Sequence, residues 1–188
     1  MKLEDYVSVR VGLNTSREKE NHDLVAYDYE DLTNDLDGLF LDSKLDIINE
    51  KPSDDNNIHL SRAGEVVFSF ISSKAGIVSD LNEGKIINQN FAKLIIVNEQ
   101  LDRSYLCYLL NESASMKKKM AISMQGSTVR KLTPSILKEL DIDLPGIEKQ
   151  RIIGKAYLYL KKRQALAKKQ AELEEKLLLE ILQKLDEK

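Results

Sequence analysis

A concentrated block of positive charge, residues 116–131, contains the residue types in this chain that are best suited to binding chemistry. It reads MKKKMAISMQGSTVRK, and no carboxylate lies between Glu112 and Glu139, although the whole chain has a formal net charge of −3. An oriented field of this kind can direct one face of an acidic protein toward a polyanion. The basic side chains of the block are Lys117, Lys118, Lys119, Arg130 and Lys131.

The centre of this block, Gln125 to Thr128, has the composition of a phosphate-binding loop. Gly126 permits a turn whose backbone amides point at one anion, and Ser127 and Thr128 add hydroxyl donors. Gln125 is a candidate reader of a base edge, because a carboxamide can form two hydrogen bonds with adenine. The candidate phosphate and base contacts are Lys117, Lys118, Lys119, Gln125, Gly126, Ser127, Thr128, Arg130 and Lys131. Secondary candidates are Lys74, in an expected Ser-Ser-Lys-Ala-Gly turn, and Arg10 and Arg17 near the N-terminus.

The three consecutive lysines also have a purely structural explanation. Apolar residues at helical spacing predict one helix from Asp102 to about Lys119, so the lysines would occupy its last turn. Cations there are stabilised by the negative end of the helix dipole, by a few tenths of a kcal/mol. The lysines therefore either contact phosphate or only complete a helix.

The sequence contains few residues that could perform catalysis or hold a cofactor. Its three prolines are separate, so it has no Pro-Pro site of an amino-methyltransferase, and it has no glycine-rich nucleotide loop. A single cysteine, Cys107, and two distant histidines, His22 and His59, do not form a metal site or a nucleophile with its base. We expect no metal, no cofactor and no catalytic residue.

One weak enzyme signal remains in Asp80, Glu83 and Lys85, which resembles the carboxylate and Glu-x-Lys pattern of metal-dependent nucleases. The same segment, Leu81 to Gly84, is also an ordinary turn sequence between two strands. We favour the turn, because short Glu-x-Lys matches are common by chance.

Several short elements precede the end of the chain. Alternating or β-branched runs predict strands at residues 5–12, 64–71 and 91–97. Thr133 followed by Pro134 predicts an N-cap and the first position of a short helix that reaches Leu140, and residues 141–144 alternate again. These elements predict an α+β fold with a mixed or antiparallel sheet and short helices.

A long helix is predicted from Ile147 to Asp186, where alanine, leucine and charged residues dominate and proline is absent. Forty residues would extend about 60 Å, which is too long to pack entirely on a body of about 145 residues. We therefore expect its apolar stripe to pair with another helix in a coiled coil. The stripe consists of Leu166, Leu173, Leu177, Ile181 and Leu185.

Composition also suggests where the protein acts. Cys107 lies in an apolar helical stretch and is expected to be a buried reduced thiol, as in cytoplasmic proteins. The N-terminus has early acids and no apolar run of signal length, and no segment is long and apolar enough to span a membrane. We expect a cytoplasmic protein without a membrane partner.

The order of these motifs resembles the specificity subunit of type I restriction-modification systems. The resemblance runs through GEVVFSFISSKAGIVSD (64–80), a strand, the helix with YLCYLL (105–110) and QGSTVRKLTPSILKELDIDLPGIEKQRIIG (125–154). It covers nearly all of residues 60–186, and the ordered combination is specific. The end of the recognition domain and the start of the conserved helix match at Leu144, Pro145, Glu148, Gln150, Arg151, Ile152 and Gly154.

The resemblance implies a non-catalytic subunit that reads double-stranded DNA and places modification (methyltransferase) and restriction subunits on a bipartite site. Residues 1–144 would form the target recognition domain, and residues 145–188 the conserved dimerisation helix. Family members usually carry two of each, so the chain resembles a half-length specificity subunit, or one half of a split or truncated one. We expect it to form a homodimer through its C-terminal helix. The sequence departs from the family at Gly146, where a second proline is usual, and at Gly154, where alanine is usual; both changes are expected to loosen the helix start.

The sequence also fits a protein of a different class, a coiled-coil adaptor. Residues 18–55 carry thirteen Asp and Glu against three lysines, a net charge of −10, which is unfavourable beside DNA unless it is turned away. A coiled-coil adaptor that has this domain but does not read DNA would share the acidity and the long helix. DNA binding at low and physiological salt distinguishes the two.

Overall fold

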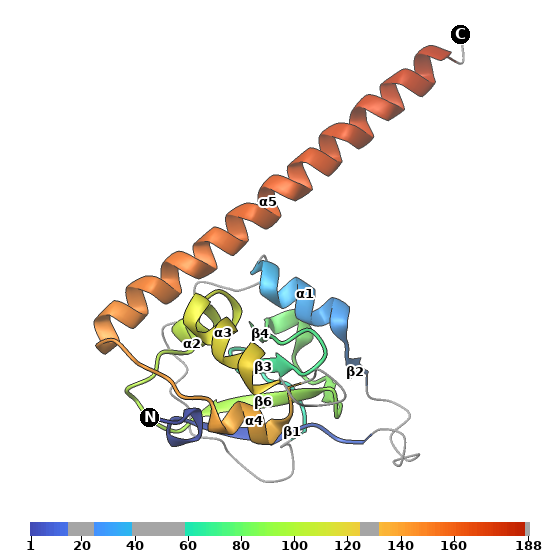
Figure 1. The fold of residues 1–188 in the computed structure, drawn as a ribbon. Helices are drawn as coiled ribbons and strands as arrows, with labels where there is room; N and C mark the ends of the chain where they lie inside the picture. Colours follow the sequence, from blue (N-terminus) through green and yellow to red (C-terminus); the bar gives the residue numbers. More distant parts are fainter. Residues whose placement is uncertain (15–24, 39–58, 125–131, 187–188) are drawn as a thin grey trace.

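Four strands form the main antiparallel sheet, in the order β1-β6-β3-β4 (Figure 1). The computed structural model describes residues 1–14, 25–38, 59–124 and 132–186. A separate parallel pair joins β2 to β5. The strands are β1 (Val7–Val11), β2 (Ala26–Tyr27), β3 (Val66–Ser69), β4 (Lys74–Ile77), β5 (Ile86–Ile87) and β6 (Phe91–Ile96).

Helices cover the main sheet, and one of them extends far beyond it (Figure 1). The α-helices are α1 (Tyr29–Asp37), α2 (Arg103–Asn111), α3 (Ala114–Ser123), α4 (Pro134–Glu139) and α5 (Ile147–Asp186). Within the described ranges, the short 3₁₀ helices are η1 (Leu3–Asp5) and η4 (Asp80–Asn82). The expected α+β class with an antiparallel sheet and a long C-terminal helix is confirmed.

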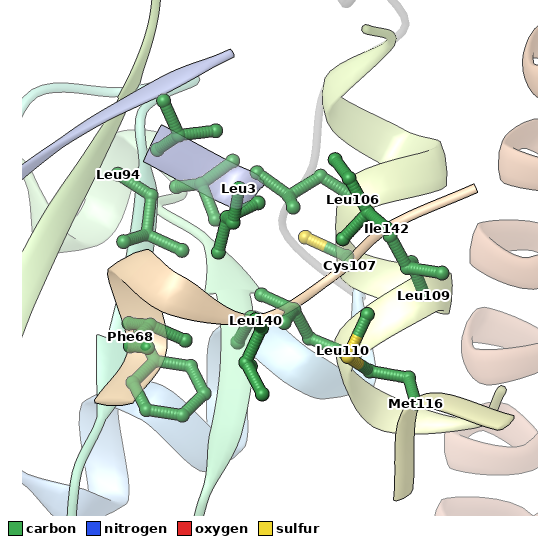
Figure 2. Close-up of a cluster of buried hydrophobic side chains, with 14 of the residues drawn as sticks. Leu3, Phe68, Leu94, Leu106, Cys107, Leu109, Leu110, Met116, Leu140 and Ile142 are labelled. Carbon is green, nitrogen blue, oxygen red and sulfur yellow. The ribbon is translucent and has the colours of Figure 1, made fainter. Parts of the chain in front are cut away.

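The central strand β3 is buried on both faces, and its side chains divide the core in two. Val66 and Phe68 point into the larger cluster, whereas Val67 points into the smaller one. This alternation follows from the two-residue period of a strand. Figure 2 shows the larger cluster, where side chains from the sheet, η1, α2, α3 and residues 140–142 converge. Cys107 is buried there, as expected.

The strands predicted from the sequence are confirmed as β1, β3 and β6, and β4 is an addition. The turn lies at residues 70–73, where Ser73 has a φ of 54°, and Lys74 is already the first residue of β4. The Oγ atom of Ser69 accepts hydrogen bonds from the amides of Ile71 and Ser72 and so closes the turn. The prediction that Lys74 lies in the turn is therefore wrong.

The single helix predicted over residues 102–119 is also wrong, because the chain forms two helices there. The helix α2 ends at Asn111, and Glu112 takes a non-helical conformation. Ser113 then caps α3, since its Oγ accepts a hydrogen bond from the amide of Met116 at 3.4 Å. Serine competes with the helical backbone for hydrogen bonds, which favours a break at such a position.

The short helix α4 begins as predicted, with Pro134 at its first position and the Thr133 hydroxyl accepting from the amide of Ile136 at 3.3 Å. The alternating segment that follows forms only one β-bridge, between Asp141 and Lys2. The amide of Ile142 donates to the carbonyl of Met1 at 2.8 Å, so this segment is tied to the first residues of the chain.

The long helix α5 has the predicted bounds, and its two halves have different surroundings. Its first part packs along α2 and contacts α1, whereas residues 166–186 are exposed throughout. Figure 1 shows this second part extending away from the sheet. Within the described residues, no helix is long and apolar enough to cross a membrane.

Candidate nucleic-acid interface

The three lysines of the basic block lie in the middle of α3, not in the last turn of a helix. Met116 and Met120 anchor the inner face of α3 in the core, and Lys117 and Lys118 between them are exposed. The dipole explanation therefore does not apply, because it acts only within the last helical turn. The exposed face of α3 presents cations that precede the predicted phosphate loop, residues 125–128, by six to eight residues in the sequence.

Lys117 belongs to a cluster of three ammonium groups around one carboxylate. Glu112 accepts hydrogen bonds from Lys117 at 3.1 Å and from Lys161 of α5 at 2.9 Å. Burial alone would raise the pKa of the Glu112 carboxyl, but these two cations hold it below its usual value. Lys74 donates to the carbonyl of Asn111 at 3.2 Å, and burial, together with the neighbouring Lys117 and Lys161, lowers its pKa.

Lys119 reaches the segment that follows α4. Its Nζ donates to the carbonyl of Asp141 at 2.7 Å and lies 3.4 Å from an oxygen of the exposed Asp143 carboxylate. Lys118 is exposed. The α3 lysines thus differ: Lys117 and Lys119 have acidic neighbours within the chain, and the Lys118 side chain faces solvent.

The secondary candidates do not gather in one place, although Lys74 lies in the cluster with Lys117. Arg10 is exposed on β1 and lies opposite Lys93 in the register with β6. Lys74 begins β4, which is the other edge of the same sheet, so the structure keeps Arg10 and Lys74 apart. The remaining candidates, Gln125, Gly126, Ser127, Thr128, Arg130, Lys131 and Arg17, lie outside the described residues.

The structure does not bring Asp80, Glu83 and Lys85 together as a nuclease site. Lys85 forms an ion pair with Asp31 of α1 at 2.6 Å, away from Glu83, which is exposed. Residues 81–84 form the end of η4 and a turn in which Gly84 has a φ of 80°, which supports the turn interpretation. Among the described residues, no group of His, Cys, Asp and Glu could hold a metal ion.

The apolar stripe on α5 is exposed, and it begins earlier than the sequence analysis placed it. Leu166, Leu173 and Leu177 are each more than half exposed. Ile152 and Tyr159 extend the stripe toward the start of the helix in two seven-residue steps, with exposures of 70 % and 71 %. The stripe members, in order, are Ile152, Tyr159, Leu166, Leu173, Leu177, Ile181 and Leu185.

The opposite side of α5 faces the rest of the chain, mainly α2. Gln150, Gly154, Tyr157 and Ala165 are buried there. At 100° per residue, this buried face and the stripe lie on nearly opposite sides of the helix. A partner helix could therefore pack along α5 without displacing the rest of the chain.

Charge is unequally divided along α5. Residues 147–163 carry six basic residues and one acidic residue, a net charge of +5, whereas residues 170–186 carry five acidic and two basic residues, a net charge of −3. A parallel pair of these helices would place like charges together, and an antiparallel pair would place opposite charges together. Charge complementarity of this kind sets the orientation of coiled coils.

Two buried side-chain amides that the sequence analysis did not weigh join α5 to the rest of the protein. Gln150 accepts a hydrogen bond from the amide of Asp102 at 3.0 Å, and Asn111 donates to the hydroxyl of Tyr157 at 2.9 Å. Asn111 also bonds both backbone groups of Ala75 on β4. In a sequence, a buried polar residue can be recognised only as a polar position inside an apolar pattern. The sequence does not show which groups it will bond.

Gly154 does not loosen the helix start, which corrects the expectation from the sequence. A Cβ atom at this position would lie 2.6 Å from the amide nitrogen of Tyr105 and 2.7 Å from the Cβ of Ser104. Gly154 is thus a point where α5 and α2 approach very closely, and a side chain would push them apart. Gly146 has open space around its Cβ position, so it carries no such requirement.

The arrangement is that of a known protein family. The model of the type I restriction modification DNA specificity domain matches residues 10–183. The chain belongs to this family. The match includes strands β3, β4 and β6 of the main sheet, the α3 lysines and nearly all of α5 in one continuous region, which agrees with the resemblance found in the motifs.

Individual proteins are similar to this chain in sequence or in fold. The type I restriction enzyme MjaVIII specificity subunit of Methanocaldococcus jannaschii is 30% identical to this specificity domain over 81 residues, 43% of this chain and 19% of that protein. The HsdS subunit of Thermoanaerobacter tengcongensis superposes with a TM-score of 0.53 at 20% identity, covering 91% of this chain and 39% of that one. A second structure concerns the complex assembly and conformational transition of the type I R-M system. One of its chains superposes with a TM-score of 0.56 at 22% identity, covering 97% of this chain and 42% of that one.

The chain therefore spans about two fifths of the length of these solved relatives. The region that matches contains one α+β body and one long helix. The fold of this region is shared with the solved relatives.

Proposed function

We propose that this specificity domain is a non-catalytic, DNA-reading subunit of a type I restriction-modification system. It would direct methylation and cleavage by partner modification and restriction subunits to a bipartite site in double-stranded DNA. The family match over residues 10–183 carries this proposal. Residues 1–144 would read DNA, and residues 145–188 would join the half-sites.

The DNA-facing surface in this proposal is the exposed face of α3 together with the residues that follow it. Lys118 is the described lysine best placed to meet phosphate, because it is exposed and its neighbours Lys117 and Lys119 are held by acidic or carbonyl groups. Lysine contacts of this kind give affinity without sequence preference. Sequence reading would then come from Gln125 and its neighbours.

The second part of the proposal is a homodimer through α5. The exposed stripe supports it, since a continuous row of apolar side chains is an association surface. The unequal charge along α5 favours an antiparallel pair. Two identical recognition domains on a two-fold axis would read an inverted repeat, with half-sites one or two duplex turns apart, at about 34 Å per turn.

DNA binding of the chain with its cognate modification subunit tests the first part. The triple variant Lys117→Ala, Lys118→Ala, Lys119→Ala should bind all sequences more weakly, and its salt slope should flatten by about 0.9 for each phosphate that is no longer neutralised. The matched control is Lys168→Ala with Lys169→Ala, which removes exposed cations from the distal part of α5. An unchanged slope in the triple variant would exclude α3 from the DNA surface.

Sequencing of methylated adenines in host DNA tests the bipartite site. Coexpression with the cognate modification subunit should produce one methylated inverted repeat with a fixed spacer. A methylated site without two-fold symmetry would contradict the homodimer.

The adaptor that does not read DNA remains the second candidate, and one observation favours it. Lys117 and Lys119, two of the three α3 lysines, already have acidic neighbours in the chain. If no DNA complex forms at low salt with the modification subunit present, the adaptor explains the structure better.

A further inference from the structure

The helices α2 and α5 run side by side in the same direction and meet at successive contacts, which we call the α2–α5 joint. Gln150 meets Asp102 at the start of α2, and Gly154 lies against Ser104 and Tyr105 one turn later. Tyr157 meets Asn111 at the end of α2. The order of the contacts is the same along both helices, so they fix the direction of α5 as well as its position.

Gln150 holds the first turn of α5 through every polar atom of its side chain. Its Oε1 accepts from the amide of Asp102 at 3.0 Å. Its Nε2 donates to the carbonyls of Gln100 and Pro145, both at 2.8 Å. The side chain is 1 % exposed, and Asp102 is itself the N-cap of α2. One amide thus connects the start of α2, the loop before it and the residue that leads into α5.

We propose that Gln150 is a positioning residue, which locks the angle of α5 against the DNA-reading part and thereby restricts the spacing of the two half-sites. The spacing part rests on the function proposed above. Asn111 and Gly154 complete the α2–α5 joint, but they lie further along α5, so Gln150 controls its point of departure.

The length of α5 makes this angle important. From Gln150 to Asp186 the helix extends about 50 Å at 1.5 Å per residue. A rotation of roughly 10° at Gln150 would move the far end by about 9 Å, the length of two or three base pairs at about 3.4 Å each. The protein can distinguish spacers that differ by one base pair only if the α2–α5 joint permits a much smaller rotation. Three short hydrogen bonds shielded from water provide such stiffness.

The angle can be measured within one chain by spin labels. Ser135→Cys on α4 and Glu175→Cys on distal α5 place two exposed labels, and dilution with unlabelled chain makes the pairs within one copy dominate the signal. Cys107 does not compete for the label, because burial raises the pKa of its thiol to about 12. The distance distribution between the labels then reports the angle of α5.

The test variant is Gln150→Met, which keeps the volume and removes the three hydrogen bonds. The same substitution at the exposed Gln164 of α5 is the matched control. We expect the distance distribution to broaden or shift in Gln150→Met and to stay unchanged in Gln164→Met. Equal distributions in Gln150→Met and the wild type would overturn the proposal. If Gln150→Met does not fold, Gly154→Ala provides the second variant: by wedging a Cβ against Tyr105, it should shift the mean distance.

Spacer preference connects the angle to function. Duplexes carrying the methylated inverted repeat, with spacers one or two base pairs longer or shorter, are bound by the chain with its modification subunit. We expect the wild type to prefer one spacer and Gln150→Met to lose that preference while it retains the half-site sequence. If Gln150→Met shows a broadened distance distribution but still prefers one spacer, Gln150 does not restrict the spacing of the half-sites. Absence of any DNA binding by the wild type would overturn the proposed function, and the label distances would still show whether Gln150 sets the angle.

Discussion

The side-chain amide of Asn111 donates a 2.9 Å hydrogen bond to the hydroxyl oxygen of Tyr157, and this contact joins the end of α2 to α5. The same side chain accepts from the amide of Ala75 at 2.8 Å and donates to its carbonyl at 2.7 Å. It thereby pairs with the edge strand β4 as another strand would. One asparagine therefore connects the sheet edge, the helix α2 and the long helix.

Replacing Asn111 by alanine should lower the free energy of unfolding by about 2 to 3 kcal/mol, because buried groups of Ala75 and Tyr157 lose their partners. Asn98 is a suitable control: its side chain accepts a local hydrogen bond from the amide of Gln100, so Asn98→Ala should cost less than about 1 kcal/mol. Urea unfolding measures both. Equal decreases in the two variants would show that Asn111 does not have this bridging role.

Gly154→Ala should destabilise the protein by about 1 to 2 kcal/mol, because crowding against the backbone of α2 outweighs the better helix propensity of alanine. Gly146→Ala meets open space and should change stability by no more than about 0.5 kcal/mol. Thermal unfolding of the two single variants makes the comparison. A stabilised Gly154→Ala would contradict the close approach of α5 to Tyr105.

Leu173→Lys should weaken the proposed homodimer by about two orders of magnitude or more. Each copy loses about 1.5 to 3 kcal/mol of burial, and a dimer contains two copies. Leu81→Lys is the control, since Leu81 is similarly exposed but lies on η4. Sedimentation equilibrium gives the dissociation constants. A wild-type chain that is monomeric at micromolar concentration without a partner would contradict the pairing itself.

Asp35 should make stability depend on pH in an unusual direction. It is buried and accepts hydrogen bonds from Tyr27 at 2.6 Å, Asn82 at 2.9 Å and the amide of Ser79 at 3.0 Å. Burial raises the pKa of this carboxyl above its ordinary value of 3.8, although the hydrogen bonds act in the opposite sense. Its stabilising contribution is therefore complete below pH 3.8 and is lost as the pH rises through the folded-state pKa.

The comparison that isolates this effect is Asp35→Asn, which keeps the shape and cannot ionise. The unfolding free energy of the wild type relative to the variant should fall as the pH rises from about 4 toward 7. Urea unfolding at a series of pH values measures the difference. A difference that rises with pH would mean that the hydrogen bonds to the carboxylate outweigh its burial.

The features that sequence analysis predicted correctly depend on neighbours in the chain. The N-cap of α4 at Thr133 and the bounds of α5 follow from capping and from apolar period, which are local. The break between α2 and α3 is local as well, but Ser113 was hidden inside a helical apolar pattern. That pattern continued through Ala114, so the competing cap was not recognised.

The fold class, the three main strands, the length of α5 and the family could all be predicted from the amino-acid sequence, because each depends on local pattern or on the order of motifs. The packed structure was needed to show which lysines are already engaged and which face of α5 stays exposed. Lys161 meets Glu112 at 2.9 Å and Lys119 meets the carbonyl of Asp141 at 2.7 Å across long stretches of chain. Such pairs depend on how helices pack against the sheet, and no local spacing specifies that packing.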